Sequence, residues 1–209
     1  MTKHRLELFS DGVFVIVLTL LVLDLKPPMQ DGWAGLKAIA PGLLVHALTF
    51  FVIGVQWLNH HIMLARVYEV KTRTLALNLL ALFFVTLIPF GARIAAEHPL
   101  GSLGIGLINA CRGFWGLGVS AMMLTASSRL YADPALRPGV IRRRLVGLGL
   151  AIAYLLAAVL GIISPWFGYA AIPLALLSFV VMPPAVPEAG HAAPEPNAAG
   201  EAADDIPPV

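Results

Sequence analysis

The residues that could carry chemistry in this chain gather at the start of a long apolar segment. Residues 5–25 read RLELFSDGVFVIVLTLLVLDL, with Arg5, Ser10 and Asp11 near the beginning and Thr19 in the middle. Polar groups are costly in lipid, so their presence in such a segment indicates a structural or functional role. Ser10 and Asp11 can donate and accept hydrogen bonds, but they form no catalytic triad with a distant histidine in any order that we recognise.

Other chemical signals are weak. His60 and His61 are adjacent, and adjacent residues on a helix project about 100° apart, so they are unsuited to hold one metal ion. The single cysteine, Cys111, gives no metal or redox motif. The sequence contains no G-x-S-x-G or H-E-x-x-H motif. We therefore expect no enzyme, no structural metal site and no cofactor.

Composition indicates an integral membrane protein, because 58% of the residues are hydrophobic and only 12% are charged, against about 25% charged in a soluble domain. Apolar runs of spanning length predict an all-α fold of six transmembrane helices in residues 1–182. Residues 183–209 are rich in proline, alanine and acidic side chains, which predicts a disordered tail. The six helices are expected near residues 5–25, 36–60, 74–92, 103–127, 145–163 and 167–182.

Basic residues predict the orientation of these helices, since Lys and Arg accumulate in cytoplasmic loops. Most of them lie in the amino terminus and in the connectors after the second and fourth helices. We therefore expect a multi-pass protein of the cell membrane with both termini in the cytoplasm. The formal net charge of +2 conceals an excess of basic residues in residues 1–182, because residues 183–209 contain acidic residues and no Lys or Arg. We do not expect nucleic-acid binding, since basic residues of a membrane protein accumulate in cytoplasmic loops.

Helical geometry divides the first predicted helix into two faces. With Ile16 at zero, Leu20 lies near +40° and Leu23 near −20°, and Thr19 lies about 60° from Ile16. Ser10 lies near +120° and Asp11 near −140°, so both point away from the Ile16/Leu20/Leu23 stripe. The helix is therefore expected to serve two different functions on its two sides.

Depth in the membrane predicts a polar network between the first three helices. Ser10 and Asp11 lie at about the level of Trp57 and His60, where the second helix leaves the membrane, and of Asn78, where the third re-enters. Trp57, His60 and Asn78 can donate N–H groups to a buried carboxylate, so we expect hydrogen bonds that hold the three helices together. The alternative is that these residues meet lipid headgroups separately.

Three further features concern the packing of polar and small residues. His46 is expected to be a packed, hydrogen-bonded histidine. Asp24 and Arg112 could form a pair within the membrane, or each could extend to the membrane surface by itself. Small residues at four-residue spacing predict close helix contacts in the fourth helix, at Gly106/Ala110 and Gly116/Ser120.

The first three helices resemble the prokaryotic branch of the transmembrane protein 175 family, which comprises endosomal, lysosomal and bacterial potassium channels. The family signature R-x-x-x-F-S-D is matched by Arg5, Phe9, Ser10 and Asp11. The W-x-x-H pattern at Trp57 to His60 and the Asn-Leu-Leu start at Asn78 are also similar to the family. A departure is Val15, where alanine is more usual.

This resemblance implies a homotetramer in which helix 1 of each subunit lines a central potassium-permeable pore, with K⁺ as the permeant ion and membrane lipid as the surroundings. It places the constriction and selectivity at Ile16, Leu20 and Leu23, with Thr19 as a nearby polar layer. A ring of such apolar side chains blocks by dewetting and must widen or hydrate to conduct, so it would be a hydrophobic gate. The resemblance makes Arg5, Phe9, Ser10, Asp11, Trp57, His60 and Asn78 packing residues.

Two other functions remain open from the residues alone. One is a proton- or cation-coupled secondary transporter that uses Asp11 and His60. The other is a non-conducting membrane scaffold. Transporters more often show inverted repeats with broken helices in both halves, and no such repeat is visible in this sequence.

Overall fold

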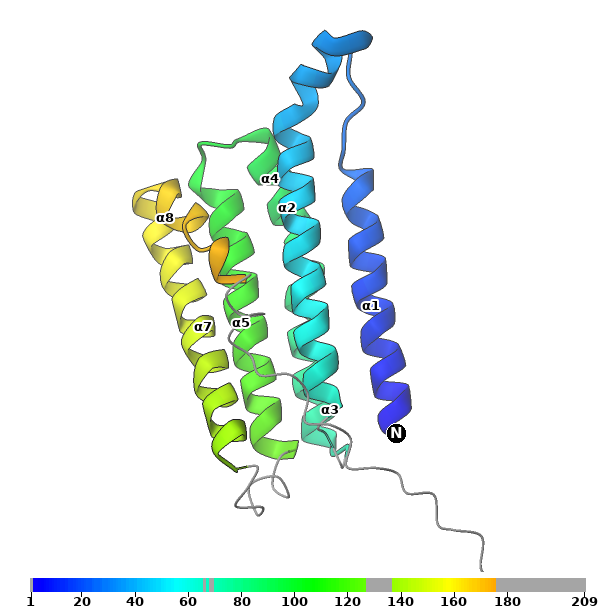
Figure 1. Cartoon of the computed structure of the whole chain (residues 1–209), viewed down its shortest axis with the longest axis vertical. Helices are drawn as coiled ribbons and strands as arrows, with labels where there is room; N and C mark the ends of the chain where they lie inside the picture. The colour runs from blue at the N-terminus through cyan, green and yellow to red at the C-terminus, as the bar shows by residue number, and fades with distance from the viewer. Residues whose placement is uncertain (1, 66, 68–69, 127–136, 176–209) are drawn as a thin grey trace, which may run out of the picture.

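The computed structural model describes residues 2–65, 67, 70–126 and 137–175, and these residues form a bundle of helices (Figure 1). The described helices are α1 (Lys3–Leu23), α2 (Gly32–Leu64), α3 (Thr72–Thr86), α4 (Ile88–Glu97), α5 (Ser102–Ala126), α7 (Arg137–Ile163) and α8 (Pro165–Tyr169).

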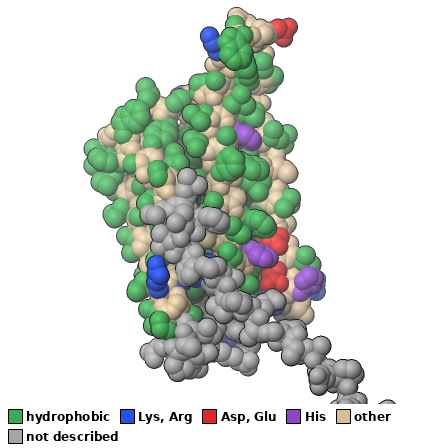
Figure 2. Space-filling model, viewed as in Figure 1, with side chains coloured by type: hydrophobic (Ala, Val, Ile, Leu, Met, Phe, Trp, Pro, Cys, Tyr) green, Lys and Arg blue, Asp and Glu red, His purple; other side chains and the backbone are tan. Residues whose placement is uncertain are grey.

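The expectation of an all-α membrane protein is confirmed. Five spans among the described residues are long and apolar enough to cross a membrane, namely Lys3–Leu23, Gly32–Leu64, Thr72–Glu97, Ser102–Leu124 and Pro138–Ile163. Hydrophobic side chains are spread over much of the described surface of the face drawn in Figure 2. In lipid, such a surface needs no protein cover, because its surroundings are as apolar as the side chains themselves.

The sixth predicted helix, at residues 167–182, is described only at its beginning. It starts within the short helix α8, and turns follow Tyr169 before Pro173. The rest of this prediction, from residue 176 onward, lies outside the described residues. The predicted boundary between residues 182 and 183 lies outside them too.

The third predicted span is broken into α3 and α4 at Leu87. Pro89 has no backbone N–H and cannot continue the hydrogen-bond ladder of a helix. Leu87 N–H instead bonds to the carbonyl of Phe84 at 3.3 Å, and the ladder resumes with Gly91 N–H to the Leu87 carbonyl at 3.2 Å. The prediction of one helix over residues 74–92 was therefore wrong in its continuity, although Thr72–Glu97 still forms one span.

Small residues let α5 pack closely in the centre of the bundle. A Cβ atom added at Gly116 would lie 2.9 Å from the Ala151 Cβ atom of α7, and one added at Gly118 would lie 3.1 Å from that of Ala81 in α3. A Cβ atom added at Gly104 would lie closer still to the backbone of α4 at Ala95. Close backbone approach of this kind strengthens van der Waals packing, which is a main source of helix association in lipid.

The apolar core of the subunit joins α1 to its neighbours. Phe14, Val17 and Leu21 of α1 pack in one cluster with residues of α2, α3, α4 and α5. The members of this cluster from the other helices include Ile53, Leu82, Val85, Ile88 and Ile108. The cluster fixes which side of α1 faces the subunit interior.

Candidate functional site

One face of α1 is buried inside the subunit at every turn. Leu6, Ser10, Phe14, Val17 and Leu21 are all at most 3% exposed. They recur at intervals of three or four residues, which places them on one side of a helix. This face anchors α1 to the bundle over its whole length.

The opposite side of α1 is open and mostly apolar. Ile16 is 57% exposed, Leu20 is 46% exposed and Leu23 is 76% exposed. Thr19, on the same stripe, is also exposed. We call Ile16, Thr19, Leu20 and Leu23 the open stripe of α1. The described part of the chain leaves about half or more of each apolar side chain on this stripe exposed, so the stripe is available to lipid or to other subunits.

The hydroxyl group of Thr19 is oriented by its own helix. Thr19 Oγ1 donates to the carbonyl of Ile16 at 2.9 Å. The hydroxyl hydrogen is therefore directed at the backbone, which leaves the oxygen lone pairs as acceptors. An oxygen of this kind, on an otherwise apolar stripe, can contact a cation or a water molecule.

Behind the open stripe, Ser10, Asn78 and His60 form a buried hydrogen-bonded chain. Asn78 Nδ2 donates to Ser10 Oγ at 3.1 Å, and His60 Nε2 lies 2.9 Å from Asn78 Oδ1. Ser10 Oγ also donates to the carbonyl of Leu6 at 2.9 Å. All three side chains are at most 1% exposed. These bonds join α1, α2 and α3 in the interior of the subunit.

Asp11 has a separate partner. Trp57 Nε1 donates to Asp11 Oδ1 at 2.8 Å. The Trp57 ring is 37% exposed, so this contact lies at the surface of the subunit, whereas the Ser10 chain lies inside it. The residues expected to form one network around Ser10 and Asp11 thus form two groups, one buried and one at the subunit surface.

Arg5 and Phe9 lie outside both groups. Phe9 is 49% exposed, and Arg5 is exposed near the beginning of α1. About half of the Phe9 side chain remains covered within the subunit. The role of Arg5 and Phe9 in packing α1 stays a prediction.

Charged residues near the carboxyl end of α1 form ion pairs that sequence reasoning missed. Lys26 Nζ lies 2.8 Å from Glu97 Oε1. Arg93 Nη1 lies 3.5 Å from Asp24 Oδ1, and Arg93 Nε lies 3.7 Å from Glu97 Oε1. The suggested pair between Asp24 and Arg112 was therefore wrong. The spacing of Arg93 and Glu97 at i and i+4 was a usable signal, but their contacts with Asp24 and Lys26 depend on the fold.

Arg112 and Asn109 of α5 turn inward. The Arg112 guanidinium carbon lies 3.8 Å from the centre of the Tyr154 ring, and Arg112 Nη2 donates to the Tyr154 hydroxyl. Asn109 Nδ2 donates to the carbonyl of Gly168 at 3.0 Å. Both side chains are buried, so the suggestion that Arg112 extends to the membrane surface was also wrong.

No group of three or more His, Cys, Asp and Glu side chains within the described part of the chain is placed to hold a metal ion. His46 lies beside Phe50, with ring centres 6.5 Å apart. Its Nδ1 atom has no hydrogen-bond partner among the described residues, so the expected hydrogen bond is missing on that side of the ring.

Comparison with known proteins relates this arrangement to a protein family. A sequence model of the family described as the endosomal/lysosomal potassium channel TMEM175 matches residues 5–89. Residues 5–89 are thus similar to the TMEM175 family. The resemblance seen in the first three helices is thereby confirmed, and the matched range contains the open stripe and both hydrogen-bonded groups behind it.

Relatives of known name share this TMEM175 region. A potassium channel of Chryseobacterium sp. is 42% identical over 113 residues, which are 52% of this chain and 59% of the relative. The human endosomal/lysosomal proton channel TMEM175 is 33% identical over 101 residues, which are 43% of this chain and 20% of that protein. The chain spans about half the length of the bacterial relatives it matches, from 48% to 59%.

A solved structure extends the likeness beyond the TMEM175 match. The crystal structure of a lysosomal potassium-selective channel TMEM175 homologue from Chamaesiphon minutus superimposes with a TM-score of 0.71 and 26% identity. It covers 87% of this chain and 98% of its own. The arrangement of the whole helical bundle is thus shared with a channel subunit.

Proposed function

We propose that this chain is a subunit of a homotetrameric, potassium-permeable channel in which four copies of α1 surround the ion path. The observation that carries the proposal is the open stripe of α1, which lies within the range matched by the TMEM175 family. A helix anchored along one face and open along the other is suited to line a pore on a symmetry axis.

The apolar side chains of the open stripe give the proposed pore a hydrophobic constriction. Ile16, Leu20 and Leu23 offer an ion no ligands, so a narrow ring of them excludes water and blocks conduction until it widens or hydrates. The Thr19 oxygen adds a polar layer between the Ile16 and Leu20 rings. In this account, α1 serves as both gate and filter.

Hydrogen bonds behind the pore face hold α1 at a fixed rotation. The chain from Ser10 through Asn78 to His60 prevents a turn of α1 that would exchange its two faces. Because the constriction depends on which side chains face the axis, this fixed rotation supports a defined pore lining. Ser10, Asn78 and His60 are therefore proposed as positioning residues, and Asp11 with Trp57 is proposed to add a contact at the subunit surface.

A coupled transporter is less well supported. Such a protein would need Asp11 and His60 together on the transport path, but His60 is 1% exposed behind the core and Asp11 is bonded to Trp57. Neither residue belongs to the open stripe. The named relatives include both potassium and proton channels, so proton permeation is measured in the same experiment as the K⁺ flux.

The proposed assembly is a multi-pass protein of the cell membrane with cytoplasmic termini. Its orientation rests on the distribution of Lys and Arg described above. Monovalent cations are proposed as the permeant ions, with membrane lipid around the tetramer.

Purified protein in liposomes loaded with potassium tests this function. We expect passive K⁺ efflux down its gradient without a coupling ion, and a changed rate when Ile16→Asn places polar groups at the constriction. Val22→Asn is the matched control, because Val22 is 54% exposed but lies about 120° from Ile16 around the helix. Absence of K⁺ flux in both the wild type and Ile16→Asn, or efflux that needs a proton gradient, would contradict the proposal.

A further inference from the structure

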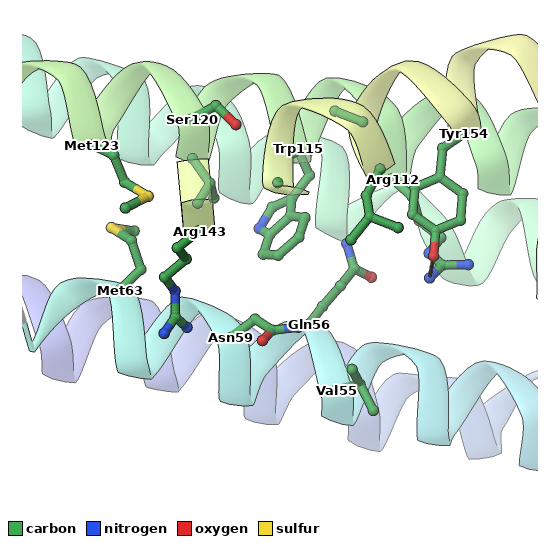
Figure 3. A pocket seen from close by; sticks show the side chains of 15 residues that line it. Val55, Gln56, Asn59, Met63, Arg112, Trp115, Ser120, Met123, Arg143 and Tyr154 are labelled. Carbon is green, nitrogen blue, oxygen red and sulfur yellow. Dashed lines mark hydrogen bonds between the residues drawn. The ribbon is translucent and has the colours of Figure 1, made fainter. Parts of the chain in front are cut away.

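A small cavity lies between α2, α5 and α7, away from the open stripe of α1. Its volume is about 50 Å³. Gln56 of α2, Arg112 and Trp115 of α5, and Arg143 of α7 bring polar groups to its lining (Figure 3). In Figure 3, the Gln56 side chain extends from α2 toward α5, on which Trp115 and Arg112 lie.

Several donors at this cavity lack protein partners. Gln56 is 3% exposed, and neither its amide nitrogen nor its amide oxygen has a hydrogen-bond partner among the described residues. The same holds for Trp115 Nε1 and for Arg112 Nε. Leaving a buried donor unsatisfied is costly, and more so for a charged group. A bound species at the cavity would remove this cost.

The lining carries positive charge deep in the bundle. Arg112 lies near the middle of α5 and is only 3% exposed. Tyr154 contacts it by its ring and its hydroxyl, but no carboxylate among the described residues forms an ion pair with it. Arg143, also 3% exposed, adds a second guanidinium to the lining. A cation at this depth needs a compensating charge, which a neutral phenol ring supplies only in part.

We propose that this cavity binds a small monovalent anion such as chloride. Guanidinium, indole and amide N–H groups are all donors that an anion accepts from. A cavity needs a volume of at least about 10–15 Å³ to hold one water molecule. This cavity of about 50 Å³ therefore has room for chloride. Water alone satisfies the donors but supplies no negative charge to Arg112.

The anion is not a permeant ion of the proposed pore. None of the residues that line the cavity comes from α1. The bound anion instead links α2 to α5 by accepting from donors on these two helices. Its expected effect is on the stability of the subunit, and this effect does not depend on whether the protein conducts potassium.

Thermal unfolding of the purified protein in detergent tests the site. At constant potassium concentration and ionic strength, replacing gluconate by chloride should raise Tm by about 3–6 °C when chloride is at ten times its Kd. Gln56→Leu should abolish most of this shift while leaving Arg112 and its Tyr154 contacts in place. The matched control is Asn109→Leu, which removes a buried amide of α5 bonded to Gly168 and should leave the chloride shift unchanged.

Crystals grown in potassium bromide locate the anion without any variant. An anomalous bromide peak within contact distance of Arg112, Gln56 and Trp115 is the expected result. Equal Tm values in chloride and gluconate, or an unaltered chloride shift in Gln56→Leu, would overturn the proposal. So would crystals in which the cavity holds only water or the bromide peaks lie elsewhere.

Discussion

At the scale of single residues, Asn78 is the centre of the buried polar chain. Its Nδ2 donates to Ser10 Oγ, and its Oδ1 forms a hydrogen bond with His60 Nε2. Both the nitrogen and the oxygen of the amide are therefore hydrogen-bonded. The depth of these residues along their helices could be predicted from the sequence, because Ser10 and Asn78 lie about one turn inside their predicted spans and His60 lies at the end of its span on the same side of the membrane. Their separation from Asp11 into a second hydrogen-bonded group could not be predicted, because it depends on the rotation of α1 against α2 and α3.

Asn78→Leu should lower the free energy of unfolding by roughly 1–2 kcal/mol, because it leaves Ser10 and His60 without their shared partner. Thermal unfolding in detergent measures this loss. Thr86→Val is the control, since the Thr86 hydroxyl is exposed and bonds only to the Phe83 carbonyl of its own helix. Equal stability of Asn78→Leu and wild type would show that the buried chain does not hold the helices together.

Asp11→Asn tests whether the carboxylate charge is used in conduction. The Asn side chain keeps an oxygen that accepts from Trp57, so we expect stability and K⁺ flux close to wild type, whereas Asp11→Ala loses the acceptor and should be less stable. Liposome flux and thermal unfolding measure the two properties. A large change of K⁺ preference in a stable Asp11→Asn protein would instead place the carboxylate on the ion path.

At the scale of helices, the two faces of α1 follow from helix geometry alone. The angular positions of Ile16, Leu20 and Leu23 predicted a stripe that points away from Ser10. In the structure the three stripe residues are exposed and Ser10 is buried. The break at Leu87 was harder to predict, because Pro89 near the end of a span can either end a helix or kink it. The ion pairs of Arg93 and Lys26 join residues distant in sequence, so no local pattern predicts them.

The packing of α5 on α7 gives a prediction at the same scale. Gly116→Val should destabilise the subunit by about 1–3 kcal/mol, because even a Cβ atom there would lie 2.9 Å from the Ala151 Cβ atom. Gly149→Ala is the control on α7, because nothing lies within 4 Å of an added Cβ atom and alanine is the better helix former. A lower Tm for Gly149→Ala than for Gly116→Val in thermal unfolding would contradict this packing.

At the scale of the whole molecule, the described residues of a single subunit leave the open stripe exposed. The sequence predicted the class of fold from composition and span length, and the TMEM175 relationship from residues in the first three helices. It could not predict what covers the stripe, because a helix face that meets lipid and one that lines an apolar pore have the same composition. Assembly around an axis is the proposed solution.

Cysteine accessibility at Ile16 tests this central claim most directly. In a Cys111→Ser background, which removes the only native cysteine, Ile16→Cys and the control Val22→Cys are reconstituted in planar bilayers. We predict that aqueous Ag⁺ blocks K⁺ current through Ile16→Cys channels and leaves Val22→Cys channels conducting. Block of Val22→Cys alone, or Ile16→Cys current that persists in Ag⁺, would contradict a pore lined by the open stripe.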